Sequence, residues 1–356
     1  MTAISEHVAP AEPGTSTLDI VVASRRRRSH RRILVHLVLA VAVLVAFWLS
    51  LTLGRTNYSS ADVIGVILGH DVEGSFTIGT LRIPRASTGA LVGLAFGLAG
   101  ATFQTMLRNP LASPDVIGIS SGASAAAVIG ILVLNLEPSA VSLLATVAAL
   151  ATAMAVYLLA YTRGGVANTR LILVGIGLSA MLSSVVSYVL SGAAAWDMQV
   201  AMRWLSGNLN GATHERLVPL VIATVVLVPV LLWLTRDLEA MRLGDQTAAA
   251  LGVPVERRRI LLIIVAVALM AFGTAAAGPI AFVAFLSGPI AARILGPVGS
   301  PVLASGLFGA LLVLVADFVA QYALGTKFPV GVLTGALGAP FLIYLLVRSN
   351  RAGGSL

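Results

Sequence analysis

Residues 33–53 read ILVHLVLAVAVLVAFWLSLTL, an almost unbroken apolar stretch that directly follows the basic segment RRRRSHRR at residues 25–32. An apolar helix of about 20 residues crosses the roughly 30 Å hydrocarbon core of a bilayer. A secretory signal peptide also begins with a basic segment. Its apolar part is only about 7–15 residues long, however, and no small-residue cleavage site follows here at residues 54–58. The stretch therefore predicts a first transmembrane helix with a cytoplasmic N-terminus, preceded by a disordered tail over residues 1–24.

The composition of the whole chain predicts a membrane protein. Of 356 residues, 58% are hydrophobic and 11% are charged, whereas a soluble domain carries about 25% charged residues. A chain this apolar has to be solvated by lipid. Cysteine is absent, which excludes disulfides and thiolate metal sites and leaves the redox compartment undetermined. The net charge of +8 does not indicate nucleic-acid binding, because the basic residues lie in the polar gaps between apolar runs.

Further apolar runs predict an all-α polytopic membrane protein of about ten transmembrane helices. After the first helix they cover residues 86–107, 116–134, 140–161, 170–190, 217–235, 260–278, 280–295, 302–324 and 330–347. Only Gly278-Pro279 separates the seventh from the eighth, so nine helices with one of them broken is the alternative. We expect a basic cytoplasmic tail at residues 1–32, one transmembrane domain at 33–348 and a short cytoplasmic tail at 349–356.

The distribution of basic residues supports this topology. With the N-terminus inside, 17 of the 23 basic residues fall in cytoplasmic segments and six fall outside. The outside residues are Arg55, Arg82, Arg85, Arg203, Arg216 and Lys327. Both termini are therefore predicted to be cytoplasmic.

Several kinds of chemistry are excluded or disfavoured by missing residues. A P-loop needs a Gly-Lys pair, but the only lysine, Lys327, follows Thr326, so the chain is no P-loop ATPase. None of the five histidines pairs with another at helical spacing, and the spans hold no acid/base pair. We expect no catalytic residues, no metal site and no cofactor.

Ionisable residues inside the predicted spans are few. Asp317 lies about 22 Å from the inner end of the ninth span, towards the outer surface, and Arg293 lies close to the inner end of the eighth. Each is read first as a packing or interfacial residue. An ion-coupled secondary transporter that uses Asp317 is the alternative, because such proteins place ionisable groups within the membrane.

Two polar segments are candidate docking surfaces. Residues 236–254 predict a short cytoplasmic helix that Asp245 caps and that Gly252 ends, which suits either a partner's groove or a solvated loop. At the outer start of the second span, Arg82 and Arg85 flank Pro84. These arginines can meet carboxylates on an external protein or extend to lipid headgroups.

At this point the sequence resembles a known family. LRIPR at 81–85, GATFQ at 100–104 and RNPLASPDVIGISSGA at 108–123 are similar to the signature of type II ABC importer permeases for ferric siderophores, vitamin B12 and haem (FecCD-like). LGD at 243–245 with Ala248 and LGV at 251–253 resembles the coupling-helix motif of that family. AGPIAFV at 277–283 and FPVGVLTG at 328–335 with GAP at 338–340 complete the pattern.

The resemblance implies two permease subunits lining one pathway in the plasma (inner) membrane, two ATP-binding cassette ATPase subunits and an extracytoplasmic binding protein. No nucleic acid is expected. It assigns docking of the binding protein to Arg82 and Arg85, and ATPase coupling to Leu243, Gly244, Asp245, Ala248, Leu251 and Gly252. We expect Lys327 to lie in the same docking surface. Pathway or packing candidates are Gln104, Asn109, Pro110, Gly118, Gly122 and Asp317. The expected cargo is a ferric siderophore, with vitamin B12 or haem as alternatives, and no bare Fe³⁺, because the spans offer no ligand set for it.

Three positions depart from the family pattern. Ile290 follows Pro289 where a histidine is usual, Gln321 replaces a common arginine, and Lys327 stands where an acidic residue is frequent. Gln321 and the segment SGNLNG at 206–211 resemble the G-type subunit of ferric enterobactin permeases, which pairs with a non-identical sister. A heterodimer is therefore expected.

Overall fold

The computed structural model describes residues 17–162, 165–166, 168–296 and 299–351. Within these ranges the chain is helical apart from short connections and one antiparallel pair of two-residue strands, in which Tyr161 pairs with Val166. The elements are α1 (Thr17–Thr52), α2 (Ser60–Ile67), the π-helix η1 (Thr77–Arg82), α3 (Ile83–Met106), the 3₁₀ helix η2 (Pro114–Ile117), α4 (Ile119–Leu132), α5 (Pro138–Ala160), β1 (Tyr161–Thr162), β2 (Gly165–Val166), α6 (Asn168–Ser191), α7 (Ala195–Leu205), α8 (His214–Arg242), α9 (Asp245–Ala250), α10 (Val255–Ala277), α11 (Val283–Leu295), α12 (Val302–Tyr322) and α13 (Val330–Arg351).

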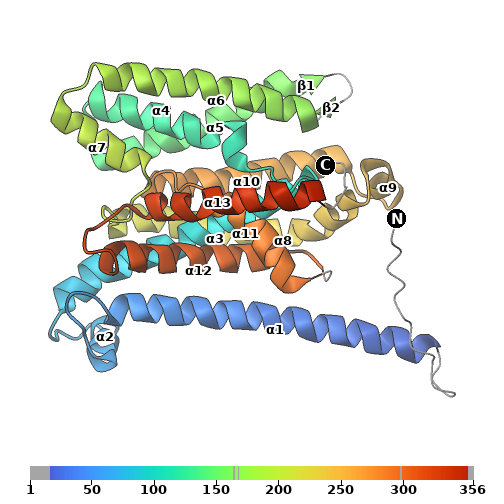
Figure 1. The fold of residues 1–356 in the computed structure, drawn as a ribbon, viewed down its shortest axis with the longest axis horizontal. Helices are drawn as coiled ribbons and strands as arrows, with labels where there is room; N and C mark the ends of the chain where they lie inside the picture. Colours follow the sequence, from blue (N-terminus) through green and yellow to red (C-terminus); the bar gives the residue numbers. More distant parts are fainter. Residues whose placement is uncertain (1–16, 163–164, 167, 297–298, 352–356) are drawn as a thin grey trace.

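The helices that cross the membrane agree with the sequence analysis. In the described ranges, seven helices are long and apolar enough to span a bilayer, and three shorter apolar helices, α4, α11 and α13, bring the total to ten. The bundle has two distinct ends. Figure 1 places α9 and the β1–β2 pair at one end, called the inner end below, and α2 and α7 at the other, called the outer end. Since α1 begins and α13 finishes at the inner end, the number of passes is even.

The first helix begins earlier than expected. α1 starts at Thr17, so residues 17–32 are helical, and the prediction of a disordered tail is wrong for this part. Residues 1–16 lie outside the described residues. Arginine is a good helix former, and a helix that leaves the bilayer meets no barrier to continuing into water. At the other end α13 continues to Arg351, so residues 349–351 of the expected tail are helical, and residues 352–356 lie outside the described residues.

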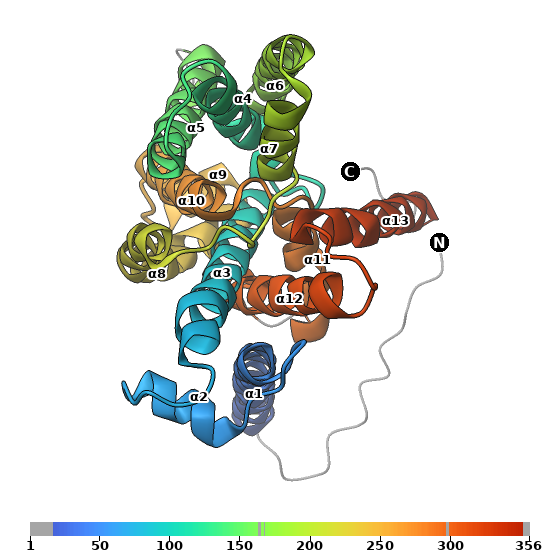
Figure 2. The ribbon, with the colours of Figure 1, turned by 90° about the vertical axis from the view of Figure 1, so that its left-hand side faces the viewer.

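The core of the bundle forms around α3. α8, α10, α11 and α12 pack on it, α4 to α7 form a group on one side, and α1 lies alone on the other (Figures 1 and 2). α3 and α12 approach so closely that a Cβ atom on Gly93 would collide with the backbone of Gly309, and the reverse also holds. Small residues at such crossings let helix backbones touch, which is how membrane helices gain packing contacts in lipid.

The connection after α10 decides between ten helices and nine. Gly278 (φ 71°) and Phe282 (φ 64°) both lie in the left-handed region and reverse the chain between α10 and α11. α10 begins at the inner end, where Arg259 meets Asp245, and α11 also finishes there, where the Ile294 carbonyl accepts from Arg31. The two helices therefore run in opposite directions, and the alternative of one broken helix is wrong.

Candidate functional site

The short helix α9 projects from the inner end between α8 and α10. Gly244 (φ 114°) is its N-cap residue, and no side chain caps the helix, so the expected capping role of Asp245 is wrong. Ala248 is buried and anchors the helix, while Gly252 (φ 86°) follows its end in a left-handed conformation. The side chains of Leu243 and Leu251 are 66% and 64% exposed. Two exposed leucines beside an anchored helix form an apolar surface suited to a partner protein.

The Asp245 carboxylate joins α9 to two membrane helices. Its Oδ1 accepts from Arg108 Nη2 at 2.8 Å, just after α3, and its Oδ2 accepts from Arg259 Nη2 at 2.6 Å, in the first turns of α10. Arg108 also donates to the carbonyl of Met241, near the end of α8, at 2.8 and 3.2 Å. Below, Arg108, Asp245 and Arg259 are called the inner clasp.

The inner clasp restricts the position of α9 more than it contributes to the stability of the fold. The Arg108 and Asp245 side chains are 44% and 47% exposed, and exposed ion pairs contribute only about 0–1 kcal/mol to stability. A carboxylate held from two sides nevertheless restricts how α9 can shift relative to α3 and α10. A displacement of α9 by a partner would therefore be passed directly to these helices.

The loop after α3 continues this connection into the membrane. Arg108 adopts a left-handed conformation (φ 51°), which turns the chain sharply after Leu107. The buried Gln104 side chain donates from Nε2 to the carbonyl of Pro110 at 3.1 Å and to that of Phe285, in α11, at 3.0 Å. The Asn109 side chain holds the turn by accepting from the backbone N–H of Leu111 at 2.8 Å.

The other residues expected in the pathway differ in their surroundings. Gln104, Asn109 and Pro110 line a cavity of about 380 Å³ that also reaches Arg108 and Arg242. Gly118 and Gly122 instead pack against neighbouring helices, since a Cβ there would meet Ser179 of α6 and Thr152 of α5, respectively. The two glycines therefore have a packing role in this chain.

At the outer end, the guanidinium group of Arg82 makes contacts within the subunit. Its side chain donates to the carbonyls of Leu51 at 2.7 Å and Thr56 at 2.6 Å, and its guanidinium lies 4.9 Å from the ring centroid of Tyr58. The residue is 8% exposed. Arg82 therefore fixes the outer end of α1 to η1 and α3, and in this conformation it is not presented to an external protein, contrary to the docking prediction.

Arg85 and Asp317 form a two-point ion pair. Arg85 Nε and Nη2 each lie 2.7 Å from an oxygen of Asp317, and Arg85 Nη1 donates to Asn210. The pair lies at the end of α12 near η1, which is the end called outer above. Both carboxylate oxygens of Asp317 accept from Arg85, a contact that agrees with the expected packing role of Asp317.

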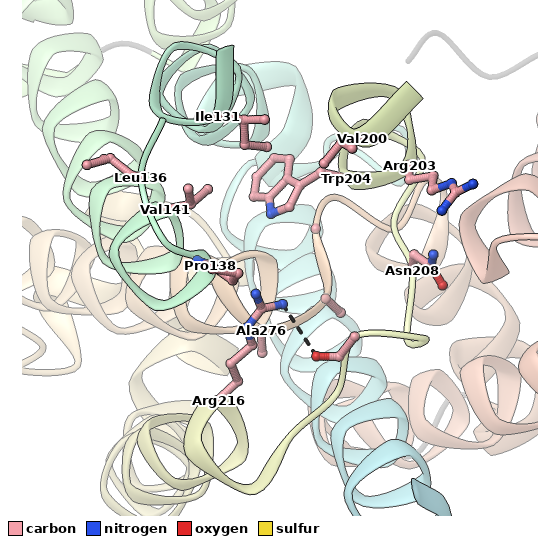
Figure 3. A pocket seen from close by; sticks show the side chains of 13 residues that line it. Ile131, Leu136, Pro138, Val141, Val200, Arg203, Trp204, Asn208, Arg216 and Ala276 are labelled. Carbon is pink, nitrogen blue, oxygen red and sulfur yellow. Dashed lines mark hydrogen bonds between the residues drawn. The ribbon is translucent and has the colours of Figure 1, made fainter. Parts of the chain in front are cut away.

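Other cations at the outer end are more accessible. Lys327, in the connection between α12 and α13, and Arg203, on α7, are exposed. Figure 3 shows Arg203 and Arg216 on opposite sides of a cavity of about 280 Å³, which the Trp204 indole also lines beside Val200 and Ile131. The dashed line in that view is the 3.4 Å bond from Arg216 to the Gly211 carbonyl. From the sequence, both arginines were predicted only to lie on the outer side.

A partly buried acidic residue lies outside the predicted spans. Asp115, in η2, accepts hydrogen bonds from the hydroxyls of Ser113 and Ser120, and all three residues line a cavity of about 460 Å³ with Phe282 and Phe285. Asp115 lies one residue before the apolar run at 116–134, so hydropathy alone does not include it in a span. The segment SPD, in which a serine precedes Pro-Asp, is the local signal for such a capped turn.

Comparison with known proteins adds independent findings. The profile of the FecCD transport family matches residues 42–348. The chain is 37% identical over 326 residues to the ferric enterobactin transport system permease protein FepG of Escherichia coli (strain K12), which covers 91% of this chain and 98% of the relative. It is also 37% identical over 325 residues to the achromobactin transport system permease protein CbrC of Dickeya dadantii (strain 3937), covering 90% of this chain and 92% of the relative.

A solved structure shows the same architecture. A metal-chelate type ABC transporter in an inward-facing conformation matches with a TM-score of 0.78 at 25% sequence identity, covering 88% of this chain and 98% of that chain. The ten-helix arrangement described above is therefore shared with a chain of an ABC transporter.

Proposed function

The chain belongs to the FecCD transport family and is a transmembrane permease subunit of an ABC importer, and from this premise we propose that its cargo is a ferric siderophore. The observation that carries the proposal is the similarity to two siderophore permeases along nearly the full length of all three chains. The cargo crosses the inner membrane as the intact chelate, from the outer end to the inner end of the bundle. Import of vitamin B12 or haem is the alternative cargo within the same family.

Energy for transport comes from a separate ATPase subunit that binds α9. The exposed Leu243 and Leu251 supply the apolar contact, and Gly244 and Gly252 allow the tight turns at the two ends of the helix. When the ATPase subunits bind ATP, they displace α9, and the inner clasp transmits the displacement to α3 and α10. Gln104 extends this connection to α11.

The binding protein docks on the outer end through accessible cations. Lys327 stays in the proposed docking surface, and the exposed Arg203 and the half-buried Arg216 replace Arg82, whose guanidinium donates to backbone carbonyls. Arg85 contributes indirectly, because its pairing with Asp317 and Asn210 holds the loop between α7 and α8 in place. Acidic side chains on the binding protein would meet these cations at a surface where electrostatic attraction speeds association.

A second, non-identical permease subunit completes the pathway. Many apolar side chains of α6 and α13 are exposed, among them Leu173, Ile176, Leu337 and Ile343, so lipid or a partner subunit has to cover them. The cavity at Asp115 faces α13, since Leu342 lines it too. We place the pathway at this side of the subunit.

The cargo is tested by reconstitution. The chain is assembled in proteoliposomes with its ATPase, its sister permease and its binding protein, and uptake is measured with radiolabelled ferric siderophore, ferric chloride and vitamin B12. ATP-dependent accumulation of the ferric siderophore alone is the expected result. Uptake of unchelated Fe³⁺, or uptake that a protonophore abolishes while ATP is present, would instead support a different cargo or the ion-coupled alternative.

A further inference from the structure

The basic part of α1 is not accounted for by the family function. Residues 25–32 precede the family match, which begins at residue 42, and they contain six arginines within eight positions. All six side chains are exposed, and the segment is helical without a break into the apolar part of α1. None of the ion pairs between described residues involves these arginines. A rigid, strongly basic rod therefore extends from the inner end of the bundle.

The arginines project from both halves of the helix, although most of them share one half. Successive residues of an α-helix are rotated by about 100°, so the four consecutive arginines at 25–28 point in four different directions. Arg31 and Arg32 project between Arg27 and Arg25, so five of the six arginines lie within an arc of about 160° and Arg26 lies outside it. Lipid headgroups can contact the arginines on both halves of the helix at once.

The neighbouring part of α1 faces lipid on most of its circumference. α1 lies at the edge of the bundle, where Figure 2 shows it packed near α12 and α2 and open elsewhere. Large apolar side chains on its inner half are exposed, namely Ile33, Leu34, Leu37, Val38 and Val41. Acyl chains must cover these side chains, so the headgroups of the same lipids surround the residues that follow towards the inner end.

The depth of the arginines matches that of the headgroups. Arg31 and Arg32 adjoin the apolar part, and Arg31 donates to the Ile294 carbonyl at the inner end of α11 at 3.5 Å. Arg25 lies about 9–11 Å further out along the helix than these two residues, at about 1.5 Å per residue. The headgroup layer is about 5–7 Å thick on each side, and long arginine side chains extend back to it. All six guanidinium groups can therefore reach lipid phosphates.

We propose that residues 25–32 bind the phosphate groups of anionic phospholipids in the inner leaflet and thereby hold α1 against the bundle. Guanidinium groups bind phosphate oxygens through paired hydrogen bonds, and basic segments next to a transmembrane helix are attracted to an anionic leaflet. The inference rests on the proposed topology of the permease. It assigns to this chain a lipid site that lies outside the transport machinery.

The test compares two variants of the full chain. In the first, Arg25, Arg26, Arg27 and Arg28 are all replaced by Gln; in the second, the same four residues are replaced by Lys, which keeps the charge. Arg31 and Arg32 remain in both to preserve topology, which labelling of an N-terminal tag verifies. Each protein is placed in nanodiscs of phosphatidylcholine with about one-third phosphatidylglycerol, and retained lipid is counted by native mass spectrometry.

We expect the wild-type and Lys chains to retain phosphatidylglycerol over phosphatidylcholine, and the Gln variant to lose this preference by roughly tenfold at low salt. High salt should remove most of the difference, because it screens exposed charges. Equal retention by the Gln variant would overturn the proposal, as would displacement of the lipid by millimolar inorganic phosphate. Loss of ATPase-subunit binding with unchanged lipid retention would also overturn it and would identify a protein as the ligand. Uptake of ferric siderophore measured in parallel separates the two proposals, since uptake can persist when the lipid preference is absent.

Discussion

Arg85 and Asp317 join the outer ends of α3 and α12 through two parallel hydrogen bonds of 2.7 Å, although 232 positions separate them in the sequence. Their side chains are 20% and 12% exposed, so water screens the pair only in part. Along the same two helices, the ion pair lies nearer the outer end than Gly93 and Gly309, at which the helix backbones touch. The pair and the glycines together define the relative position of α3 and α12.

Removing one member of this pair should destabilise the permease without changing its energy source. Asp317→Asn leaves the Arg85 guanidinium partly unpaired, and we expect a loss of about 1–3 kcal/mol in the free energy of unfolding. The measurement is thermal unfolding of the purified subunit in detergent. The double variant Arg85→Leu/Asp317→Leu should lose less than the sum of the single variants, because neither charge is left alone.

The same variant distinguishes an ABC permease from an ion-coupled carrier. Uptake by Asp317→Asn in the reconstituted complex should stay ATP-driven and insensitive to a protonophore. If neutralising Asp317 abolished uptake while the protein unfolded at its normal temperature, the carboxylate would have to carry a coupling ion.

The inner clasp should matter for coupling more than for stability. We expect Arg108→Ala or Asp245→Ala to lower transport-stimulated ATPase activity by roughly tenfold, while the half-exposed pair contributes no more than about 1 kcal/mol to folding. The two substitutions should be non-additive, because each breaks the same contact. Arg257→Ala is the control, since Arg257 is exposed at the start of α10 and takes part in none of the described ion pairs. Additive losses would show that the two residues act separately.

The helices that cross the membrane were predictable from runs of apolar residues, because the backbone of a segment within lipid must form its own hydrogen bonds. A run of about 20 apolar residues must be helical when no water is present to satisfy its backbone. The rule failed for residues 17–32, because α1 continues as a helix into water, where hydropathy carries no information. It also could not foresee α7, an amphipathic helix of 11 residues that is too short for a span.

The candidate site was predictable only in part. The end of α9 followed from Gly252, but the prediction that Asp245 caps its start was wrong. The partners of Asp245 could not be predicted either, because Arg108 lies 137 residues away. For Arg82 and Arg85, the sequence alone could not distinguish an exposed cation from one that binds carbonyls or a distant carboxylate. The hydrogen-bond partner of each side chain depends on how the helices pack, and a single sequence does not specify which helices are neighbours.

The exposed Arg203 and the half-buried Arg216 at the outer end should control association with the binding protein. The double variant Arg203→Glu/Arg216→Glu should slow association at least tenfold at low salt and should invert its salt dependence, measured by surface plasmon resonance with the permease in nanodiscs. Arg82→Gln is the contrasting variant. It removes a buried donor to two carbonyls, so it should lower the unfolding temperature while the association rate of the folded fraction stays normal. A normal association rate for the double glutamate variant would remove the cavity of Figure 3 from the docking surface.

Contact between the backbones of α3 and α12 makes Gly93 a sensitive helical position to test. A methyl group there would collide with the carbonyl oxygen of Gly309, which cannot rotate away because it belongs to a helix. We expect Gly93→Ala to cost about 1–3 kcal/mol through overpacking and to lower the unfolding temperature of the subunit. Gly177→Ala is the matched control in α6, because its Cβ would meet no atom within 4 Å. There the substitution should be neutral or stabilising by up to about 1 kcal/mol, since alanine is the better helix former. Equal effects at the two positions would show that helix propensity, and not the close approach of α3 and α12, governs the response.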